Sequence, residues 1–205
     1  MIAGSYGHDR WKAGAGGCTY TFAAPSGPSN SITITAGTLQ QVIEGASLAG
    51  GTYTLSWTGT AQGRIGAGSY AASPVTGSVT AGANTTIEFN TGTLSRVKFE
   101  LGSVATPWVA LSPQQQLAAC QRYYQVQPAV YVAGYAPAAN NVINTLAYPV
   151  PMRAAPTVAY ASASGANASA LFAYNTTSSN VALAATITAT GWGYATATVL
   201  LSADL

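Results

Sequence analysis

The chain contains very little charge. Only 6% of its 205 residues are Asp, Glu, Lys or Arg, against roughly 25% in an average soluble protein. From residue 111 to the end the charged side chains are Arg122, Arg153 and Asp204. Because 48% of the residues are hydrophobic, the composition excludes disorder. Little charge also means little repulsion between copies, so the carboxyl-terminal half is predicted to pack against copies of itself.

Basic clusters and long apolar runs are also missing. The net charge is +2 and no basic cluster occurs, which argues against binding nucleic acid through its phosphates. Polar residues and glycine interrupt the apolar runs before they reach the ~18 residues of a membrane-spanning helix. Residues 1–11 have no apolar core of the kind found in signal peptides. We therefore expect neither nucleic-acid binding nor membrane insertion.

Residues that commonly perform catalysis or bind metals are scarce. The single histidine, His8, has no Gly-x-Ser-x-Gly nucleophile motif to act with, and its isolation excludes zinc sites of ordinary composition. A glycosidase needs two carboxylates across a sugar ring. We expect Glu44 and Glu100 instead to form salt bridges with Arg10, Arg96 or Lys98, or to face solvent. The sequence predicts no enzyme activity, no cofactor and no metal.

The two cysteines, Cys18 and Cys120, lie about a hundred residues apart. One distant pair does not make a disulfide framework. Buried free thiols and an intramolecular disulfide both remain open.

What the first half does contain is a series of short β-strand patterns. Residues 52–58 alternate, with Tyr53, Leu55 and Trp57 on one face and smaller polar residues on the other. Glycines such as the pair at 50 and 51 separate the strands as turns. The predicted strands are 18–23, 31–35, 39–44, 52–58, 64–67, 85–89 and 96–101. So many short strands in about 100 residues predict an all-β domain, a jelly-roll β-sandwich over residues 1–110.

A single helix is predicted at residues 112–125. Ser112 is a favourable N-cap, Pro113 occupies the first helical position, and Gln115 completes a capping box. Pro128 ends the helix, and one face would contain Leu117, Cys120 and Tyr124, for which we expect burial. We interpret residues 111–128 as a helix linking two domains.

Strand patterns return after the helix. They predict a second β-sandwich over residues 129–205, with strands 129–135, 142–150, 156–161, 170–174, 181–190 and 192–201. In strand 142–150 both alternating faces hold apolar residues, among them Val142, Leu146 and Ile143. Such a strand needs cover on both sides, which a neighbouring subunit would supply.

Aromatic residues provide the candidate binding site. Tyr and Trp number 12 and 4 against 4 Phe, and both combine a flat apolar face with a polar tip. Trp57 is interpreted as core. Trp192, between two glycines at a strand start, is either a ligand contact or a packing residue. The predicted ligand-binding residues are Trp192, Tyr194, Tyr135, Asn140 and Asn141.

Several blocks of sequence resemble a known family. Residues 97–108, VKFELGSVATPW, resemble the close of a carbohydrate-binding-module-like jelly roll common in phage tail proteins. The following Cys-Gln-Arg-Tyr-Tyr at 120–124, and Pro-Met-Arg at 151–153, are similar to blocks of tail-fibre carboxyl-terminal regions. His8 to Trp11 resembles an "aDRW" strand, and residues 202–205 the usual chain end. The family's earlier strand, with an Asn…Trp-Gln-Arg-Gly block, is missing here, so the jelly roll is expected to lack its first strand.

The resemblance implies a bacteriophage tail fibre or tail spike that binds a host cell-surface receptor. The implied assembly is a homotrimer, in which residues 129–205 form the receptor-binding and trimerisation domain. The implied partners are a bacterial polysaccharide or lipopolysaccharide and other virion tail proteins, and the implied location is the distal end of the tail. Two alternatives stay open: a purely structural trimerisation or decoration module of the virion, and a carbohydrate-binding module of a secreted bacterial enzyme.

Overall fold

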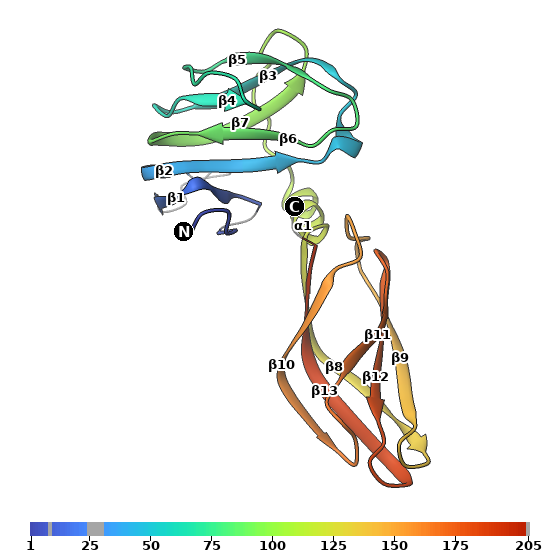
Figure 1. Ribbon diagram of the computed structural model, residues 1–205. Helices are drawn as coiled ribbons and strands as arrows, with labels where there is room; N and C mark the ends of the chain where they lie inside the picture. The colour runs from blue at the N-terminus through green and yellow to red at the C-terminus, as the bar shows by residue number, and fades with distance from the viewer. Residues whose placement is uncertain (8–9, 24–30, 204–205) are drawn as a thin grey trace. The chain divides into compact units, whose positions relative to one another are not determined.

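The computed structural model describes residues 1–7, 10–23 and 31–203. His8, Asp9 and residues 204–205 belong to two of the blocks that resemble the phage tail family, and they lie outside the described residues. The chain divides into two compact units, Met1–Ala110 and Leu111–Leu205 (Figure 1). The protein is mostly β, with antiparallel sheets in a sandwich-like arrangement, which confirms the predicted all-β class. Among the described residues, no helix is long and apolar enough to cross a membrane.

The described residues of the first unit form seven strands in one antiparallel sheet. They are β1 (Lys12–Phe22), β2 (Ile32–Ile43), β3 (Gly51–Thr58), β4 (Gly63–Ile65), β5 (Val75–Val79), β6 (Thr85–Phe89) and β7 (Gly92–Leu101). The strand order is β4-β6-β2-β7-β3-β5, and β1 also pairs with β2. A short 3-10 helix, Gly45–Ser47, follows β2.

The sheet divides at β2 and folds over its own core. The first residues of β2 (32–34) pair with β7, while its later residues (39–43) pair with β6. The sheet's two end strands come together, because a Cβ added at Gly77 of β5 would lie 3.2 Å from the side chain of Ile65 in β4. Between the layers Phe89 is fully buried and packs edge-on against Trp57, with ring centroids 5.0 Å apart.

Several predicted strands of this unit were wrong in extent and one strand was missed. The predicted strands 18–23 and 96–101 begin earlier, at Lys12 and Gly92. Residues 31–35 and 39–44 are not separate strands, because residues around Gly37 stay paired with β1 through an irregular register. β5 was not predicted at all, because Gly77 at the centre of VTGSV was interpreted as a turn residue. Trp57 is buried, as expected, and its indole N–H donates to the Ala61 carbonyl at 2.9 Å.

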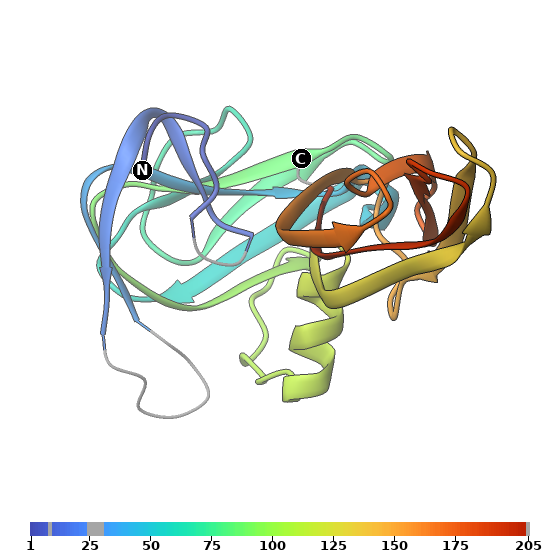
Figure 2. The same cartoon turned by 90° about the horizontal axis from the view of Figure 1, so that it is seen from below.

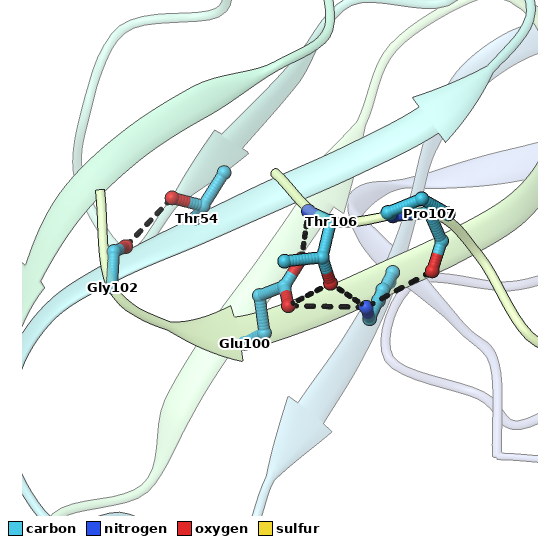
Figure 3. A network of polar contacts seen from close by, with 6 residues as sticks. Thr54, Glu100, Gly102, Thr106 and Pro107 are labelled. Carbon is cyan, nitrogen blue, oxygen red and sulfur yellow. Dashed lines mark hydrogen bonds and ion pairs between the residues drawn. The ribbon is translucent and has the colours of Figure 1, made fainter. Parts of the chain in front are cut away.

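A polar network fixes the segment that follows β7 (Figure 3). The Thr106 backbone N–H and hydroxyl donate to the two Glu100 oxygens, at 2.8 and 2.6 Å. Lys98 lies 3.1 Å from Glu100 and donates to the Pro107 carbonyl. Next to this network, the Thr54 hydroxyl donates to the Gly102 carbonyl at 2.7 Å. The predicted salt bridge between Glu100 and Lys98 is thus confirmed.

The network predicts an unusual titration for Glu100. Hydrogen bonds from the Thr106 hydroxyl and N–H lower the Glu100 pKa from 4.5 to about 2. A lowered folded pKa means that the network stabilises the fold fully above pH 4.5 and loses this contribution as the pH falls toward 2. Carboxyl NMR should give a midpoint near 2 in the wild type. In Thr106→Ala, which removes one donor, the midpoint should move upward; an unchanged midpoint would contradict the assignment.

The second unit is a sandwich of two three-stranded antiparallel sheets (Figures 1 and 2). One sheet has the order β10-β13-β8 and the other β11-β12-β9. The strands are β8 (Tyr124–Ala136), β9 (Asn141–Ala147), β10 (Thr157–Ala166), β11 (Phe172–Thr176), β12 (Asn180–Thr186) and β13 (Gly191–Ser202). Alternate residues of β12 and β13, including Leu183, Val199 and Leu201, are fully buried between the sheets.

The helix α1 (Pro113–Gln121) lies outside the two sheets of this unit (Figure 2). Its capping box is confirmed: Ser112 Oγ accepts from Gln115 N at 3.3 Å and Ser112 N donates to Gln115 Oε1 at 3.0 Å. The predicted end at residue 125 is wrong, because Tyr124 already begins β8. The buried Gln125 side chain donates to the carbonyls of Gln121 and Val150, which joins the helix end to the sandwich.

Two expectations that depended on the longer helix are therefore wrong, and so is the extent of one later strand. The sandwich begins at Tyr124, not at residue 129. Leu117 and Tyr124 do not share a helical face, and in the single chain they are 58% and 49% exposed. Strand 142–150 ends at Ala147, since the Tyr148 N–H bonds to the Ser179 carbonyl. Both cysteines are free thiols, with Cys18 buried and Cys120 only half-buried.

Candidate functional site

The candidate site lies at the end of the second unit that is remote from α1. β8 starts beside the helix end and runs 13 residues to Ala136, about 40 Å away at the rise of a strand. There three connections meet: residues 137–140 between β8 and β9, residues 187–190 between β12 and β13, and Asn167 after β10. Ala139 N donates to Ile187 O at 2.8 Å and Ile187 N to Asn140 O at 2.9 Å, so two of these connections are bonded together.

Two of the predicted aromatic residues are direct neighbours across the sheet. Trp192 of β13 is the register partner of Tyr135 of β8. Their side chains are 73% and 63% exposed, because both point away from the core on the outer face of the sheet. In the single chain Trp192 therefore does not pack into the core, and of the two roles left open for it, its exposure is compatible with a ligand contact. Cross-strand partners have Cβ atoms about 5 Å apart, so the two rings form one continuous aromatic surface.

Tyr194 extends this surface along β13. It stands two residues from Trp192 on the same face, and its ring stacks on Tyr131, with centroids 5.3 Å apart and planes 24° apart. Tyr131 is not among the predicted ligand-binding residues. The register places Tyr131 opposite Thr196, so the two tyrosines form a diagonal pair. We call Tyr131, Tyr135, Trp192 and Tyr194 the aromatic surface.

The two predicted asparagines lie beside this surface but differ in setting. Asn140 belongs to the connection between β8 and β9 and is exposed. Asn141 begins β9 in the opposite sheet, pairs with Thr186 and accepts a hydrogen bond from its hydroxyl at 2.8 Å. Asn140 can therefore offer its amide to a ligand from the rim, whereas Asn141 already has a structural bond.

Asn167 is the residue that sequence reasoning missed. Its amide donates to the carbonyls of Ala189 and Trp192, at 2.8 and 2.9 Å. Its side-chain oxygen accepts from Thr188 Oγ1 at 2.9 Å and from the Ala189 N–H at 2.8 Å. Asn167 has a positive φ of 51°, which Asn adopts more readily than most residues. A Cβ at Gly193 would lie 2.3 Å from the Asn167 carbonyl, so only glycine lets β13 pass so closely.

The sequence pattern that contained Asn167 pointed elsewhere. Asn167-Ala168-Ser169 matches the N-glycosylation pattern, and such a match arises readily by chance in a chain rich in Asn, Ser and Thr. Asn167 lies 25 residues before Trp192 in the sequence, so only the folded structure brings the asparagine beside the Gly-Trp-Gly turn.

Asn167 should hold Trp192 in position, which a substitution can test. Asn167→Ala removes four hydrogen bonds and strains a left-handed position, so unfolding should become easier by about 2 kcal/mol. Asn167→Gly removes the same bonds without the strain and should cost less. Urea unfolding measures both, with Asn175→Ala in exposed β11 as the control, within about 0.5 kcal/mol of wild type. Equal stability of all three variants would refute this role for Asn167.

The surroundings of the aromatic surface are uncharged. Between Arg153 and Asp204 the sequence has no charged residue, and Arg153 is committed to the opposite end of the unit, where Nη1 donates to the Ala203 carbonyl at 3.0 Å. Among the described residues, no cluster of three or more His, Cys, Asp or Glu is arranged to hold a metal ion. The surface can therefore bind by stacking and neutral hydrogen bonds, which suits the C–H faces and hydroxyls of a sugar.

Searches against protein-family models, curated proteins and solved structures find no match to this chain.

Proposed function

We propose that this chain is a receptor-binding module of a bacteriophage tail fibre or tail spike, and that its aromatic surface binds a bacterial surface polysaccharide or lipopolysaccharide. The observation that supports this function best is the exposed, uncharged aromatic surface at one end of the second sandwich. Trp192 and Tyr135 present their rings to solvent from paired strands. Exposed aromatic rings on a sheet are suited to stacking on sugar rings. The Trp192 and Tyr135 side chains do not pack into the core of the fold.

The sequence blocks that resemble tail-fibre regions support the same proposal. The Cys-Gln-Arg-Tyr-Tyr and Pro-Met-Arg blocks are about 30 residues apart in sequence, yet the Arg153 N–H donates to the Arg122 carbonyl at 2.9 Å. Ala203 near the chain end donates to the Tyr123 carbonyl at 2.7 Å. The blocks thus form one structural element at the base of the second sandwich, where α1 ends.

We propose further that the protein acts as a homotrimer through the outer face of the β11-β12-β9 sheet. Ile143, Ala184 and Phe172 form one row across its three strands. Ala184 points away from the core, because the alternate β12 residues Val181, Leu183 and Ala185 form the core cluster. Ala184 is nevertheless fully buried. Ile143 is 51% exposed beside it. Ile143 and the partly exposed Phe172, on either side of Ala184, together with the low charge of the unit, form an apolar surface suited to another subunit.

The same row favours a second candidate, a structural module that only trimerises or decorates the virion. The two functions differ in whether the protein binds glycans. An array of bacterial O-antigen and capsular polysaccharides tests this with fluorescently labelled protein. A receptor-binding module binds at least one polysaccharide and a structural module binds none. Release of reducing sugar from a bound polysaccharide would instead indicate a polysaccharide-degrading enzyme.

A further inference from the structure

The first unit has a groove of about 390 Å³ where the sheet divides at β2. One wall comes from β2 and β6, with Gln41 and Ile87, and the other from β7, with Leu94 and Phe99. Pockets that hold small ligands typically start at about 300 Å³. The groove is therefore large enough for a single sugar residue. It belongs to the first unit, whereas the aromatic surface belongs to the second.

The lining of the groove is rich in arginine and tryptophan. Arg10, Arg96, Trp11 and Trp108 all line it, in a chain with only seven Lys and Arg and four Trp. The Arg96 guanidinium lies 6.0 Å from the centre of the Trp108 ring. Trp11 packs edge-on against the buried Phe89 at 5.9 Å, which fixes its ring. Arginine binds carboxylate and phosphate groups through paired N–H donors, and indole rings pack on sugar faces.

The backbone at Arg96 is strained. Arg96 has a φ of 52°, in the left-handed region that a residue with a long side chain rarely adopts. It follows Ser95 at an irregularity in the pairing of β7 with β3. Strained residues of this kind concentrate at ligand sites, because the strain serves to place a side chain. Here the strained residue places its guanidinium at the groove, above Trp108.

Trp108 is held by the network around Glu100. Thr106 and Pro107, which directly precede it, bond to Glu100 and Lys98 respectively (Figure 3). The segment is thus fixed before a ligand arrives, which lowers the entropic cost of binding. Two indoles and the Arg96 guanidinium on fixed supports, with Arg10 also lining the groove, form a site with a defined chemical preference.

We propose that this groove binds a sugar residue that bears a negatively charged group, either the carboxylate of a uronic acid or a phosphate. The arginines bind the anionic group and the indoles pack against the ring. The site does not depend on the aromatic surface of the second unit. It would give the chain a second glycan site that selects acidic sugars, whereas the aromatic surface is suited to neutral ones.

Calorimetry with the full-length chain and three probes tests this inference. The probes are trigalacturonate, glucose 6-phosphate and the neutral maltotriose, each at millimolar concentration. We expect at least one anionic probe to bind about tenfold or more tightly than maltotriose, since charge-assisted hydrogen bonds supply this difference. Trigalacturonate and glucose 6-phosphate distinguish a carboxylate source from a phosphate source. No binding of either anionic probe, or equal binding of all three, would overturn the proposal.

Variants then locate the site and separate it from the proposed receptor site. Arg96→Gly relieves the left-handed strain, so its unfolding midpoint should be no lower than that of wild type while binding weakens at least tenfold. Trp108→Ala should also weaken binding. Lys12→Gln, which removes a cation at Tyr6 outside the groove lining, and Trp192→Ala in the second unit should leave binding of the anionic probe unchanged. Wild-type affinity in Arg96→Gly and Trp108→Ala would refute the site.

Discussion

Replacing Trp192 and Tyr135 together by alanine should weaken binding of the proposed trimer to the proposed polysaccharide receptor by about a thousandfold. Stacked aromatic rings contribute about 0.5 to 1.5 kcal/mol each beyond their buried area, so each site should lose about tenfold in affinity. Three linked sites multiply this loss, because the avidity of the assembly depends on every site. Surface plasmon resonance on the immobilised polysaccharide measures the trivalent loss, and NMR with a short oligosaccharide measures the loss per site.

The double variant should remain folded, because both side chains point into solvent and exposed substitutions usually change stability by about 0.5 kcal/mol or less. Tyr124→Ala is the matched control, since Tyr124 is exposed at the opposite end of the same strand. Binding should also change little between low and high salt, because the second unit has no charged residue between Arg153 and Asp204. Retained affinity in the double variant would place the receptor site elsewhere on the chain.

Ile143→Asp should convert the trimer to folded monomers. Ile143 is half-exposed in the single chain, and it lies in the apolar row with Ala184 and Phe172. In the proposed trimer each interface would bury on the order of 1,000 Å² or more. A buried, unpaired carboxylate costs several kcal/mol, and the trimer would contain three of them. In light scattering the mass should fall from about three times the chain mass to near 20.7 kDa.

Ala159→Asp is the matched control for this change, because Ala159 is exposed on the β10-β13-β8 sheet instead. That variant should stay trimeric. Dissociation of Ala159→Asp with an intact Ile143→Asp trimer would move the subunit interface to the other sheet. A wild-type mass near 20.7 kDa at micromolar concentration would contradict trimerisation itself.

Much of the fold could be predicted because local patterns coincided with tertiary packing. Residues 85–89 form a strand with the predicted bounds, and in 52–58 the alternating Tyr53, Leu55 and Trp57 are all buried. The Ser112 capping box formed as expected, since it depends only on residues within one helical turn. These features are local, and neighbouring residues determine them.

Features set by distant residues could not be predicted. Thr54 lies on the polar face of its strand, yet it is buried because the segment after β7 covers it and accepts its hydrogen bond. The helix was expected to continue to residue 125, but Tyr124 pairs with Ser202 as the start of β8. That pairing partner lies 78 residues away in sequence, and no helical periodicity could reveal it.

The candidate site was predictable in its aromatic residues and not in its support. Trp192 between two glycines and Tyr135 near a strand end were visible as aromatic residues at turns. Their register as direct partners required the pairing of β8 with β13. The role of Asn167 required the distances to Ala189 and Trp192, which no sequence spacing contains.

The indole N–H signal of Trp192 tests the central proposal most directly. The four tryptophans of the chain give four such signals, and each can be assigned by substitution. Titration of the full-length protein with a polysaccharide fragment that it binds on the array should shift the Trp192 signal and leave that of the buried Trp57 unchanged. Binding that leaves the Trp192 signal unmoved would contradict a receptor site on the aromatic surface.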